Sequence, residues 1–578
     1  MAEKKSAWAH VVEKIDRKAA IFAAIVLGVF FLYTRVNELA QFAPVSDELS
    51  NIVTVKYLDK NIIPLYAPGT YSPNYKKLPM KPYVYWEYSA ELYLFRYPVY
   101  FFFSKILGQN DPMGWNWSVA SNLVPVFMLL IALIIYYARS RSMSLSPLSV
   151  GFLICIVFLW RWSGQSFHYI RHYSFTVISI VVCHFYANYI MTHSKASDTK
   201  KDILIILVAA IPLLFNLLNA TYLVFWIIFI SLRRLRAAYQ QNGIQALLKG
   251  IAIAAGATLL TAGAGFLILK FVIGKNILGG HLYININNMK VIPHFFQWSI
   301  NNGVKSLIAV ALLIAAAVFR AKRMDPYERG LLLTAVGFVT TALAVLSISG
   351  GETTLSHPTR YTFFFHVGWL IIAAVLLSNF VQFLSERLPT IPLKKTGLFF
   401  AALVAFSYCY REKIDQIPGF LYLQPKKEIQ GQIDKLARVI DRDTVVISAD
   451  PIIIWLNFPR TKYYFFRPIE LPSKTDMMNL GRYGVDKHGF IVDWYGDTYV
   501  GNMWSFVKML KENESKVIVF DGVRPTDDAL WGFLKRNGFN VDHTPIAVKK
   551  ILERLPKGNS FDPPAEVTAA MRKKPSLR

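Results

Sequence analysis

The stretch "AAIFAAIVLGVFFLYT" at residues 19–34, followed closely by "APVSDELSNIVTV" at residues 43–55, decides the fold that the sequence predicts. The first stretch contains no charged residue, and the apolar run continues to about residue 36. A helix of roughly 20 apolar residues is long enough to cross a hydrocarbon core about 30 Å thick. Because similar runs recur along the first 410 residues, the sequence predicts a polytopic α-helical membrane protein.

The composition supports this class of fold. The chain has 578 residues, of which 54% are hydrophobic and 17% are charged, which is too apolar for ordinary soluble domains. We therefore expect about eleven transmembrane helices, with 203–218 and 219–232 as the shortest candidates. The candidate runs lie near residues 19–36, 118–138, 147–162, 172–191, 203–218, 219–232, 250–273, 304–320, 330–348, 361–382 and 397–410.

The distribution of cations predicts how these helices are oriented. Cytoplasmic loops of membrane proteins carry an excess of Lys and Arg, whereas long loops such as 37–117 are exempt from the count. An N-terminus in the cytoplasm, at the inner (plasma) membrane, puts the following residues on the cytoplasmic side: Lys4, Lys5, Lys14, Arg17, Lys18, Arg139, Arg141, Lys195, Lys200, Lys201, Arg233, Arg234, Arg236, Arg320, Lys322, Arg323, Lys394 and Lys395. An odd number of spans then makes the C-terminal region extracytoplasmic. No cleavage pattern precedes residue 19, so the first helix is expected to remain as an anchor.

The chain divides by composition into three parts. Residues 1–410 form the expected transmembrane domain, with 37–117 as a long first external loop. Strand-like and helix-like patterns alternate in residues 411–558 and predict an α/β domain, which is expected to be extracytoplasmic. Residues 559–578 have the composition of a mobile tail. The expected strands are "TVVISAD" (444–450), "GFIVDWYG" (489–496) and "KVIVFDG" (516–522), and the expected helices are "NMWSFVKMLKEN" (502–513) and "DDALWGFLKRNGF" (527–539).

The net charge of +26 suggests an anionic partner. The basic residues are dispersed through the loops and no nucleic-acid motif accompanies them, so anionic membrane lipid is expected and nucleic acid is not. The three cysteines, Cys155, Cys183 and Cys409, lie in or beside apolar runs. Their spacing fits neither disulfide pairing nor zinc binding.

The acids of "SDEL" have two interpretations. Ser46 can cap a helix whose first turn holds Asp47 and Glu48, because the helix dipole favours negative charge there. Adjacent helical side chains point about 100° apart, so both acids cannot face one substrate. One of them can then be catalytic while the other is structural. A second helix is expected in the aromatic stretch at 81–108, lying in the membrane interface.

The order of motifs resembles the GT-C membrane glycosyltransferases, especially the branch of protein O-mannosyltransferases and the aminoarabinose transferase of lipid A. "SDEL" is followed by "NIIPLYAPGTY" (61–71) and "KPYVYWEYSAELYLF" (81–95). "FHYIRHYSFTVISI" (167–180) and "HPTRYTFFFHVGWLIIAAVLL" (357–377) are similar to later motifs of that family. The resemblance covers roughly residues 15–380.

The resemblance implies transfer of a sugar from a polyprenyl-phosphate donor, with inversion, to a glycan, lipid or protein acceptor at the outer membrane face. Asp47 can then act as the base that activates the acceptor, with Glu48 orienting it or binding a sugar hydroxyl. Fixed cations stabilise the departing phosphate, and Arg360 and His357 are the candidates. Alternatively, these two residues lie at the end of a helix, and their side chains only reach toward the membrane interface.

Further candidates follow from the same resemblance. Arg171, between His168 and His172, can hold sugar or phosphate, or anchor a helix at the interface. His281 and His294 are candidates for guarding the acceptor entrance. Four residues of the aromatic stretch either face the donor and line a sugar pocket or belong to an interfacial helix: Lys81, Tyr85, Trp86 and Glu87.

No obligatory cofactor or metal is expected besides the lipid-linked sugar. The second external loop, 161–172, contains no Asp or Glu, whereas hard cations prefer several oxygen ligands. Glu87, Asp111 or Glu352 could complete a metal site if the loops fold together.

The alternative function is a transporter or flippase of lipid-linked or small anionic substrates, but the predicted spans contain almost no internal charge. A third interpretation is a membrane scaffold whose C-terminal domain binds a partner.

Overall fold

The computed structural model describes part of the chain, and all structural statements concern that part. The described residues are, with short gaps, 91–139, 173–248, 304–349, 358–387, 394–409 and 424–466, together with single residues or short segments at 11–27, 42–43, 51–59, 65–66, 83–84, 149–155, 483–485, 491–493, 498–500, 505–509 and 517–520.

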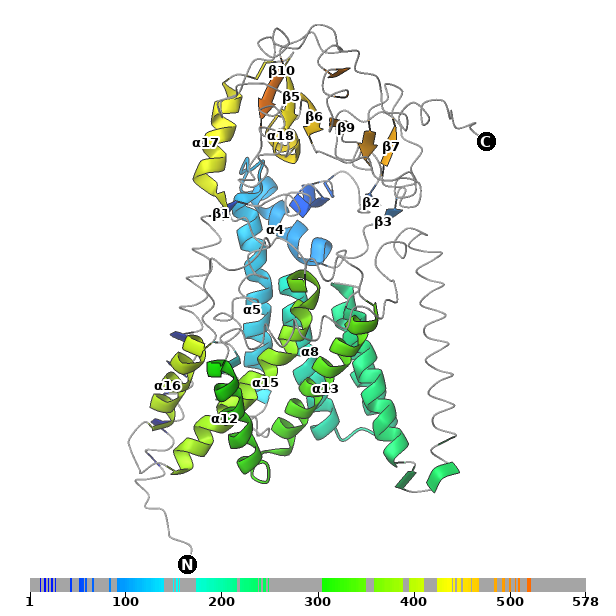
Figure 1. The fold of residues 1–578 in the computed structure, drawn as a ribbon, viewed down its shortest axis with the longest axis vertical. Helices are drawn as coiled ribbons and strands as arrows, with labels where there is room; N and C mark the ends of the chain where they lie inside the picture. Colours follow the sequence, from blue (N-terminus) through cyan, green and yellow to red (C-terminus); the bar gives the residue numbers. More distant parts are fainter. Residues whose placement is uncertain are drawn as a thin grey trace, which may run out of the picture. The chain divides into compact units, whose positions relative to one another are not determined.

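The chain forms two compact units. The first, the helical unit, comprises Met1–Leu39, Val119–Gly265 and His281–Phe420. The second comprises Ala40–Ser118, Phe266–Gly280 and Leu421–Arg578, so the expected first loop clusters with the C-terminal region. The helices of the first unit are visible in Figure 1. They are α5 (Trp115–Arg139, which begins in the second unit), α8 (Tyr173–His193), α9 (Asp198–Ala210), an unlabelled helix at 220–237, α12 (Val304–Arg320), α13 (Pro326–Ser349), α15 (Pro358–Arg387) and α16 (Lys394–Cys409).

The prediction of about eleven membrane spans is wrong. Among the described residues, two helices are long and apolar enough to cross a membrane, Ser174–His193 and Val367–Arg387. Two others are shorter apolar helices, Ala311–Arg320 and Lys395–Ala405. The expected run at 250–273 lies outside the described residues.

Helix breaks explain why apolar runs overstate the number of spans. The helix α9 has 13 residues and gives way to a 3₁₀ turn at Ile211–Leu214. Pro212 lies in that turn and has no backbone N–H to continue the α-helical ladder. At 1.5 Å per residue, α9 is only about 20 Å long. A continuous apolar sequence therefore does not guarantee a continuous helix.

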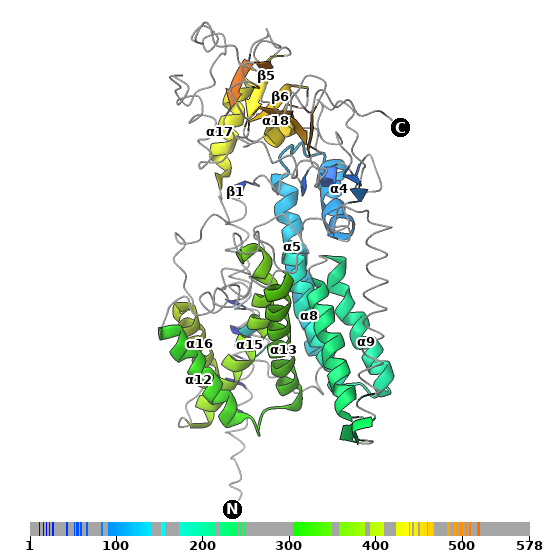
Figure 2. The ribbon, with the colours of Figure 1, turned by 45° about the vertical axis from the view of Figure 1, so that its right-hand side comes forward.

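The core of the helical unit lies between α8, α13 and α15. The two long helices α13 and α15 pack along each other, and α8 contacts both, as Figure 2 shows from a second angle. Phe338 and Leu331 of α13 and Leu370 of α15 are fully or almost fully buried. Tyr327, at the start of α13, is also buried and donates its hydroxyl to the carbonyl oxygen of Phe185 over 2.9 Å.

Gly368 permits the close approach of α15 to α13, which gives a first prediction. A Cβ atom at this position lies 2.6 Å from Cγ2 of Val339 and 3.1 Å from Cδ1 of Phe338. We expect Gly368→Ala to force these helices apart and to lower the free energy of unfolding by about 1–3 kcal/mol, as overpacking does. Thermal unfolding in detergent measures this.

Gly397 of α16 is the matched control, because a Cβ atom there meets nothing within 4 Å. Gly397→Ala removes backbone freedom without overpacking and is expected to raise stability by roughly 0.5–1 kcal/mol. Equal effects of the two substitutions would contradict the close packing of α13 on α15.

The second unit is built on a six-stranded sheet in the order β10-β5-β6-β9-β8-β7. The first four strands in this order run parallel, and β8 and β7 pair antiparallel on the edge. The strands are β5 (Val445–Ser448), β6 (Lys462–Phe466), β7 (Tyr483–Val485), β8 (Ile491–Asp493), β9 (Thr498–Val500) and β10 (Val517–Phe520).

Two helices cover this sheet. Leu436 of α17 (Lys426–Ala437) and Ile454 of α18 (Pro451–Asn457) form one hydrophobic cluster with Val446 of β5 and Tyr463 of β6. All four residues of β5 are buried, as expected for a central parallel strand. The three strands expected from the sequence are confirmed as β5, β8 and β10. The expected helix at 502–513 is helical at its described residues, whereas 527–539 and the tail 559–578 lie outside the described residues.

Candidate functional site

The candidate residues from the sequence lie almost entirely outside the described part of the chain. Arg360 is the exception, since the backbone of α15 is helical from Pro358 and Arg360 lies in its first turn. The others outside the described residues are Asp47, Glu48, Lys81, Tyr85, Trp86, Glu87, Arg171, His281, His294 and His357. The segment that follows Asp47 and Glu48 along the chain can nevertheless be described.

The segment that follows Asp47 and Glu48 is helical at its described residues within 51–56, as the "SDEL" start predicts. Ile52, Val55 and Leu58 are buried, so this segment packs its apolar side chains into the core. Its last residue, Lys56, donates from Nζ to the carbonyl oxygens of Asp111 (3.1 Å) and Pro112. Burial lowers the pKa of Lys56 to about 8, although the charge of Asp111 opposes this shift.

Asp59 gathers three donors from the next helical segment. Its carboxylate accepts from the hydroxyls of Tyr97 (3.2 Å) and Tyr100 (2.9 Å) and from Nζ of Lys105 (2.9 Å). We call these four residues the Asp59 cluster. Charge-assisted hydrogen bonds are stronger than neutral ones, so the cluster fixes the end of the 51–59 segment against the helix that follows.

The protonation of the cluster follows from this geometry. Burial alone would raise the pKa of Asp59, but the hydrogen bonds from Lys105 and Tyr100 outweigh it and leave the pKa below its ordinary value. Burial and the hydrogen bond to Asp59 raise the pKa of Tyr100 to about 12. At neutral pH the cluster therefore holds an ionised carboxylate between two neutral phenols and an ammonium group.

The helix that carries the tyrosines and the lysine is wider than an α-helix at two places. It consists of a π-helical turn (Leu92–Arg96), an α-helical turn (α4, Tyr97–Phe101) and a second π-helical turn (Phe102–Ile106). Arg96 is completely buried and forms an ion pair with Glu91. The prediction of one helix through 81–108 is wrong at its start, because Tyr83–Val84 is a strand, β3, paired with β2 (Leu65–Tyr66).

This helical segment exposes several apolar side chains. Leu94 and Ile106 are each 62% exposed. Phe101, Phe102 and Leu107 are exposed as well. We call these five residues the apolar face. A polar cluster and an exposed apolar face on one short helix form an amphipathic surface.

The same helix packs on the first turn of α5. The ring of Tyr100 meets that of Trp117 edge-on, with centroids 5.5 Å apart. Gly114, just before α5, has a φ of +67°, and a Cβ atom there would lie 2.9 Å from the indole nitrogen of Trp117. Asp111, considered above as a metal ligand, accepts the backbone N–H of Asn116 over 2.7 Å and caps α5.

The C-terminal part of the chain joins this region within the second unit. β1 (Phe42–Ala43) pairs antiparallel with β4 (Gln424–Pro425), directly upstream of the segment that holds Asp47. Lys426 of α17 lies over the ring of Trp115 at 4.7 Å, and Asn457 of α18 contacts the sulfur of Met113. The α/β domain therefore starts beside β1, which precedes Asp47 in the sequence.

The helical unit contains a buried polar group of its own. His184, midway along α8, is fully buried, and its Nε2 lies 3.0 Å from the hydroxyl of Thr334 on α13. Its Nδ1 lies 3.5 Å from the hydroxyl of Tyr222, on the helix at 220–237. The side-chain oxygen of Asn188 accepts from Thr334 over 3.1 Å. Both ring nitrogens thus have partners on other helices, which is the pattern of a structural histidine.

The Asp59 cluster was missed in the sequence, although a weak signal is present. Tyr97, Tyr100 and Ser104 recur at helical spacing, and Lys105 adjoins them. Nothing in the local sequence indicates that Asp59 faces them. Among the described residues, no group of three His, Cys, Asp or Glu side chains could hold a metal ion.

Comparison with known proteins adds no relative, since no protein-family model matches the chain and no curated protein is similar to it. The class of the protein therefore rests on the sequence and on the geometry of the described residues.

The Asp59 cluster gives a second prediction. We expect Asp59→Asn to lower the free energy of unfolding at pH 7 by about 0.5–1 kcal/mol, because the solvent-exposed ion pair with Lys105 is lost and the hydrogen bonds from the two tyrosines lose their charged acceptor. Since the folded-state pKa of Asp59 is lowered, its contribution is present above the unfolded value near 3.8 and is lost as the pH falls further.

Thermal unfolding of wild type and Asp59→Asn from pH 7 to pH 3 measures this effect, and the two curves are expected to converge at low pH. Asp434→Asn is the control, because Asp434 is exposed on α17 and accepts one hydrogen bond, from Gln430. A constant difference across the pH range would contradict the ionised state of Asp59.

Proposed function

We propose that the chain is an inverting glycosyltransferase that moves a sugar from a polyprenyl-phosphate donor to a glycan, lipid or protein acceptor at the outer face of the membrane. The observation that supports it best is the pairing of the Asp59 cluster with the apolar face on one helix. A lipid-linked sugar has a polar, anionic head and a long apolar tail. A surface of the same dual character suits such a substrate.

The charges of this surface suit the phosphate of the donor. Lys105 is half exposed, and its ammonium group, which lies 2.9 Å from the carboxylate of Asp59, has three protons to donate. The exposed side of Lys105 can therefore receive a phosphate oxygen. Leu94, Phe101 and Ile106 offer apolar contacts to isoprene units.

The chemistry itself is assigned to the acids just upstream. An acceptor hydroxyl becomes a good nucleophile when a positioned base removes its proton, and we assign this role to Asp47, with Glu48 as its partner. Arg360, His357 and Arg171 are proposed to stabilise the departing phosphate. Lys81, Tyr85, Trp86 and Glu87 remain candidates for the sugar pocket, and His281 and His294 for the acceptor side. Cationic side chains replace a metal in this proposal.

The α/β domain is proposed to bind the acceptor. Its first strand, β4, pairs with β1, which precedes Asp47 in the sequence, and this pairing supports an acceptor-binding role for the domain. The proposed location is the inner (plasma) membrane, with a cytoplasmic N-terminus and the α/β domain outside. The cations of the helical unit support this orientation through the positive-inside rule.

A transporter or flippase is the alternative, and His184 is the observation that bears on it. Ionisable residues within membrane helices often mark substrate or proton pathways. His184 is instead enclosed by aromatic rings, with Tyr222 and Trp226 centroids 6.0 and 5.7 Å away. A side chain without access to water or substrate favours a structural role.

Transfer and transport differ in one product. The purified chain is reconstituted in nanodiscs with synthetic polyprenyl-phosphate sugars and candidate acceptors, and free polyprenyl phosphate is measured by mass spectrometry. A transferase releases it, with inversion at the anomeric carbon, and continues to do so in excess chelator. Movement of intact donor between leaflets of vesicles without release would instead support the flippase. Loss of transfer in chelator, restored by magnesium or manganese, would contradict the metal-free mechanism.

A further inference from the structure

Helix ends rich in cations meet at one end of the helical unit. Asp202, near the start of α9, forms an ion pair with Arg233, near the end of the helix at 220–237. The ring of Tyr327, at the start of α13, contacts the ring of His193, the last residue of α8, with centroids 5.6 Å apart and planes tilted by 56°. The ends of α12 and α15 are joined by the ion pair of Arg320 with Glu386. We call this the basic end.

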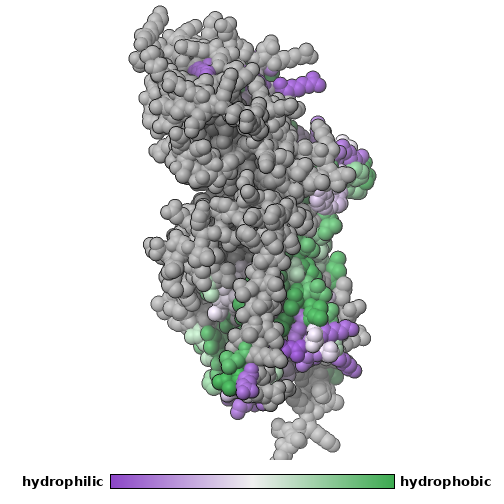
Figure 3. Space-filling view, turned by 90° about the vertical axis from the view of Figure 1, so that its right-hand side faces the viewer, coloured by the Kyte–Doolittle hydropathy of each residue, from purple (hydrophilic) through white to green (hydrophobic). Residues whose placement is uncertain are grey.

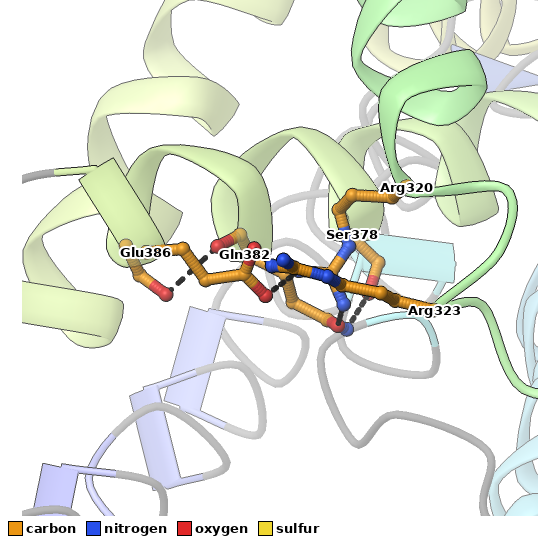
Figure 4. Close-up of polar contacts among 6 residues, drawn as sticks. Arg320, Arg323, Ser378, Gln382 and Glu386 are labelled. Atoms are coloured by element: carbon orange, nitrogen blue, oxygen red, sulfur yellow. Dashed lines mark hydrogen bonds and ion pairs between the residues drawn. The ribbon is translucent and has the colours of Figure 1, made fainter. Parts of the chain in front are cut away.

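Two carboxylates at the basic end, those of Asp202 and Glu386, are held in ion pairs. Asp202 binds a second guanidinium, that of Arg234, at 2.6 Å. Glu386 is shared by Arg320 and Arg323, and Arg320 also donates to Gln382 over 2.6 Å, as Figure 4 shows. The negative charge of these two carboxylates is thus already neutralised by cations of the protein, whereas Asp198, at the start of α9, is exposed.

Two more acids at this end are used for structure. Asp16 accepts the backbone N–H groups of Lys395 and Thr396 at 2.8 and 2.9 Å and so caps α16. The buried Glu328 accepts the hydroxyl of Ser149 at 3.0 Å. Further cations at this end lie outside these ion pairs. Those with exposed side chains are Lys195, Lys200, Arg236, Lys322, Arg329 and Arg387.

The exposed cations directly adjoin exposed apolar side chains. Val318 and Phe319 of α12 are 68% and 73% exposed, and the next exposed residues along the chain include Lys322 and Arg323. Leu232, 61% exposed, precedes the arginines of the helix at 220–237. Figure 3 shows this boundary, with hydrophobic surface on the described helices giving way to hydrophilic surface at their lower end.

We propose that the basic end is a binding surface for the head groups of anionic phospholipids. Apolar side chains that border cations match the boundary between acyl chains and phosphates in a bilayer. A soluble acidic partner or a nucleic acid would be attracted by the cations but would leave the adjoining apolar side chains in water. This inference concerns a lipid contact apart from the proposed transfer site and does not depend on the glycosyl chemistry.

The preference for anionic lipid can be measured directly. Spin-labelled phosphatidylglycerol and phosphatidylcholine are added in turn to the full chain in phosphatidylcholine vesicles, and the fraction of motionally restricted probe is compared. We expect several-fold preference for phosphatidylglycerol, and at least tenfold weaker binding of it after Lys195, Lys200, Lys322 and Arg329 are all changed to Gln, since each cation near an anionic surface contributes roughly fivefold. Within the described part of the chain, these four residues form no ion pair with an acid.

Matched controls separate this effect from a general loss of charge. A control variant with Lys427→Gln, Lys435→Gln and Arg438→Gln, which changes exposed cations of the second unit, should leave the preference for phosphatidylglycerol unchanged. If the quadruple variant fails to fold, high salt on the wild type provides a second measurement, because screening should abolish a head-group preference. An unchanged preference in the quadruple variant or in high salt overturns the proposal. Equal competition by inorganic phosphate or by an acidic polymer overturns the lipid assignment.

Discussion

Asp47→Asn is expected to lower the rate of sugar transfer by about 10²–10⁴-fold, the usual effect of losing a general base. Asparagine has almost the same shape as aspartate but cannot accept the acceptor's proton at neutral pH. Donor binding and membrane insertion are therefore expected to stay close to those of the wild type. The rate at which polyprenyl phosphate forms in a single turnover in nanodiscs measures the chemical step, because dissociation of the products does not limit that rate.

Glu48→Gln is the matched control for this prediction. Adjacent helical side chains point about 100° apart, so one of the two acids should matter much more. We expect a smaller loss for Glu48→Gln than for Asp47→Asn. A larger loss would reverse the two roles, and wild-type turnover in Asp47→Asn would refute the base. Unfolding temperatures of both variants show whether either acid acts chiefly as a helix-starting charge.

Arg360→Ala is expected to lower kcat/KM for the lipid-linked donor by about 10²–10³-fold, the usual cost of removing one fixed donor from a developing negative charge. Arg360→Lys is expected to lose less, because the ammonium keeps the charge but not the planar fork that binds two phosphate oxygens. Transfer rates over a range of donor concentrations, together with direct donor binding, measure both variants.

Arg387 is the control for Arg360, because it lies in the last turn of the same helix, α15, at its opposite end. Arg387→Ala should leave the donor's kcat/KM unchanged. If Arg360 only anchors the helix at the interface, Arg360→Ala should lower stability while transfer by the folded fraction stays normal. Equal donor kinetics in Arg360→Ala and the wild type would exclude the phosphate role.

The sequence predicted individual elements well where local periodicity is strong. The apolar run at 172–191 corresponds to α8, and the run at 304–320 coincides with α12. The alternating segments of the C-terminal region are confirmed as three strands of one sheet. The number of membrane spans was wrong, because hydropathy cannot report a break such as the proline-containing turn after α9.

Contacts between distant segments could not be read from the sequence. Asp59 meets Tyr97 and Tyr100 across 38 and 41 residues, so these contacts depend on how two segments pack. The two π-helical turns that flank Tyr97 and Tyr100 could not be predicted from the amino-acid composition of the segment. The same limit applies to His184, whose partners lie on two other helices.

The sequence by itself determined the apolar helices, the strands of the α/β domain and the excess of cations, because these depend on side-chain type and on spacing along one element. Only the tertiary structure decided which acids are neutralised and which cations stay exposed, since the ion pairs of the basic end join residues far apart in the sequence. It also decided that β1, near the start of the chain, pairs with β4 at the start of the α/β domain. Pairing between strands so far apart follows from how the whole chain packs and has no signature in either strand alone.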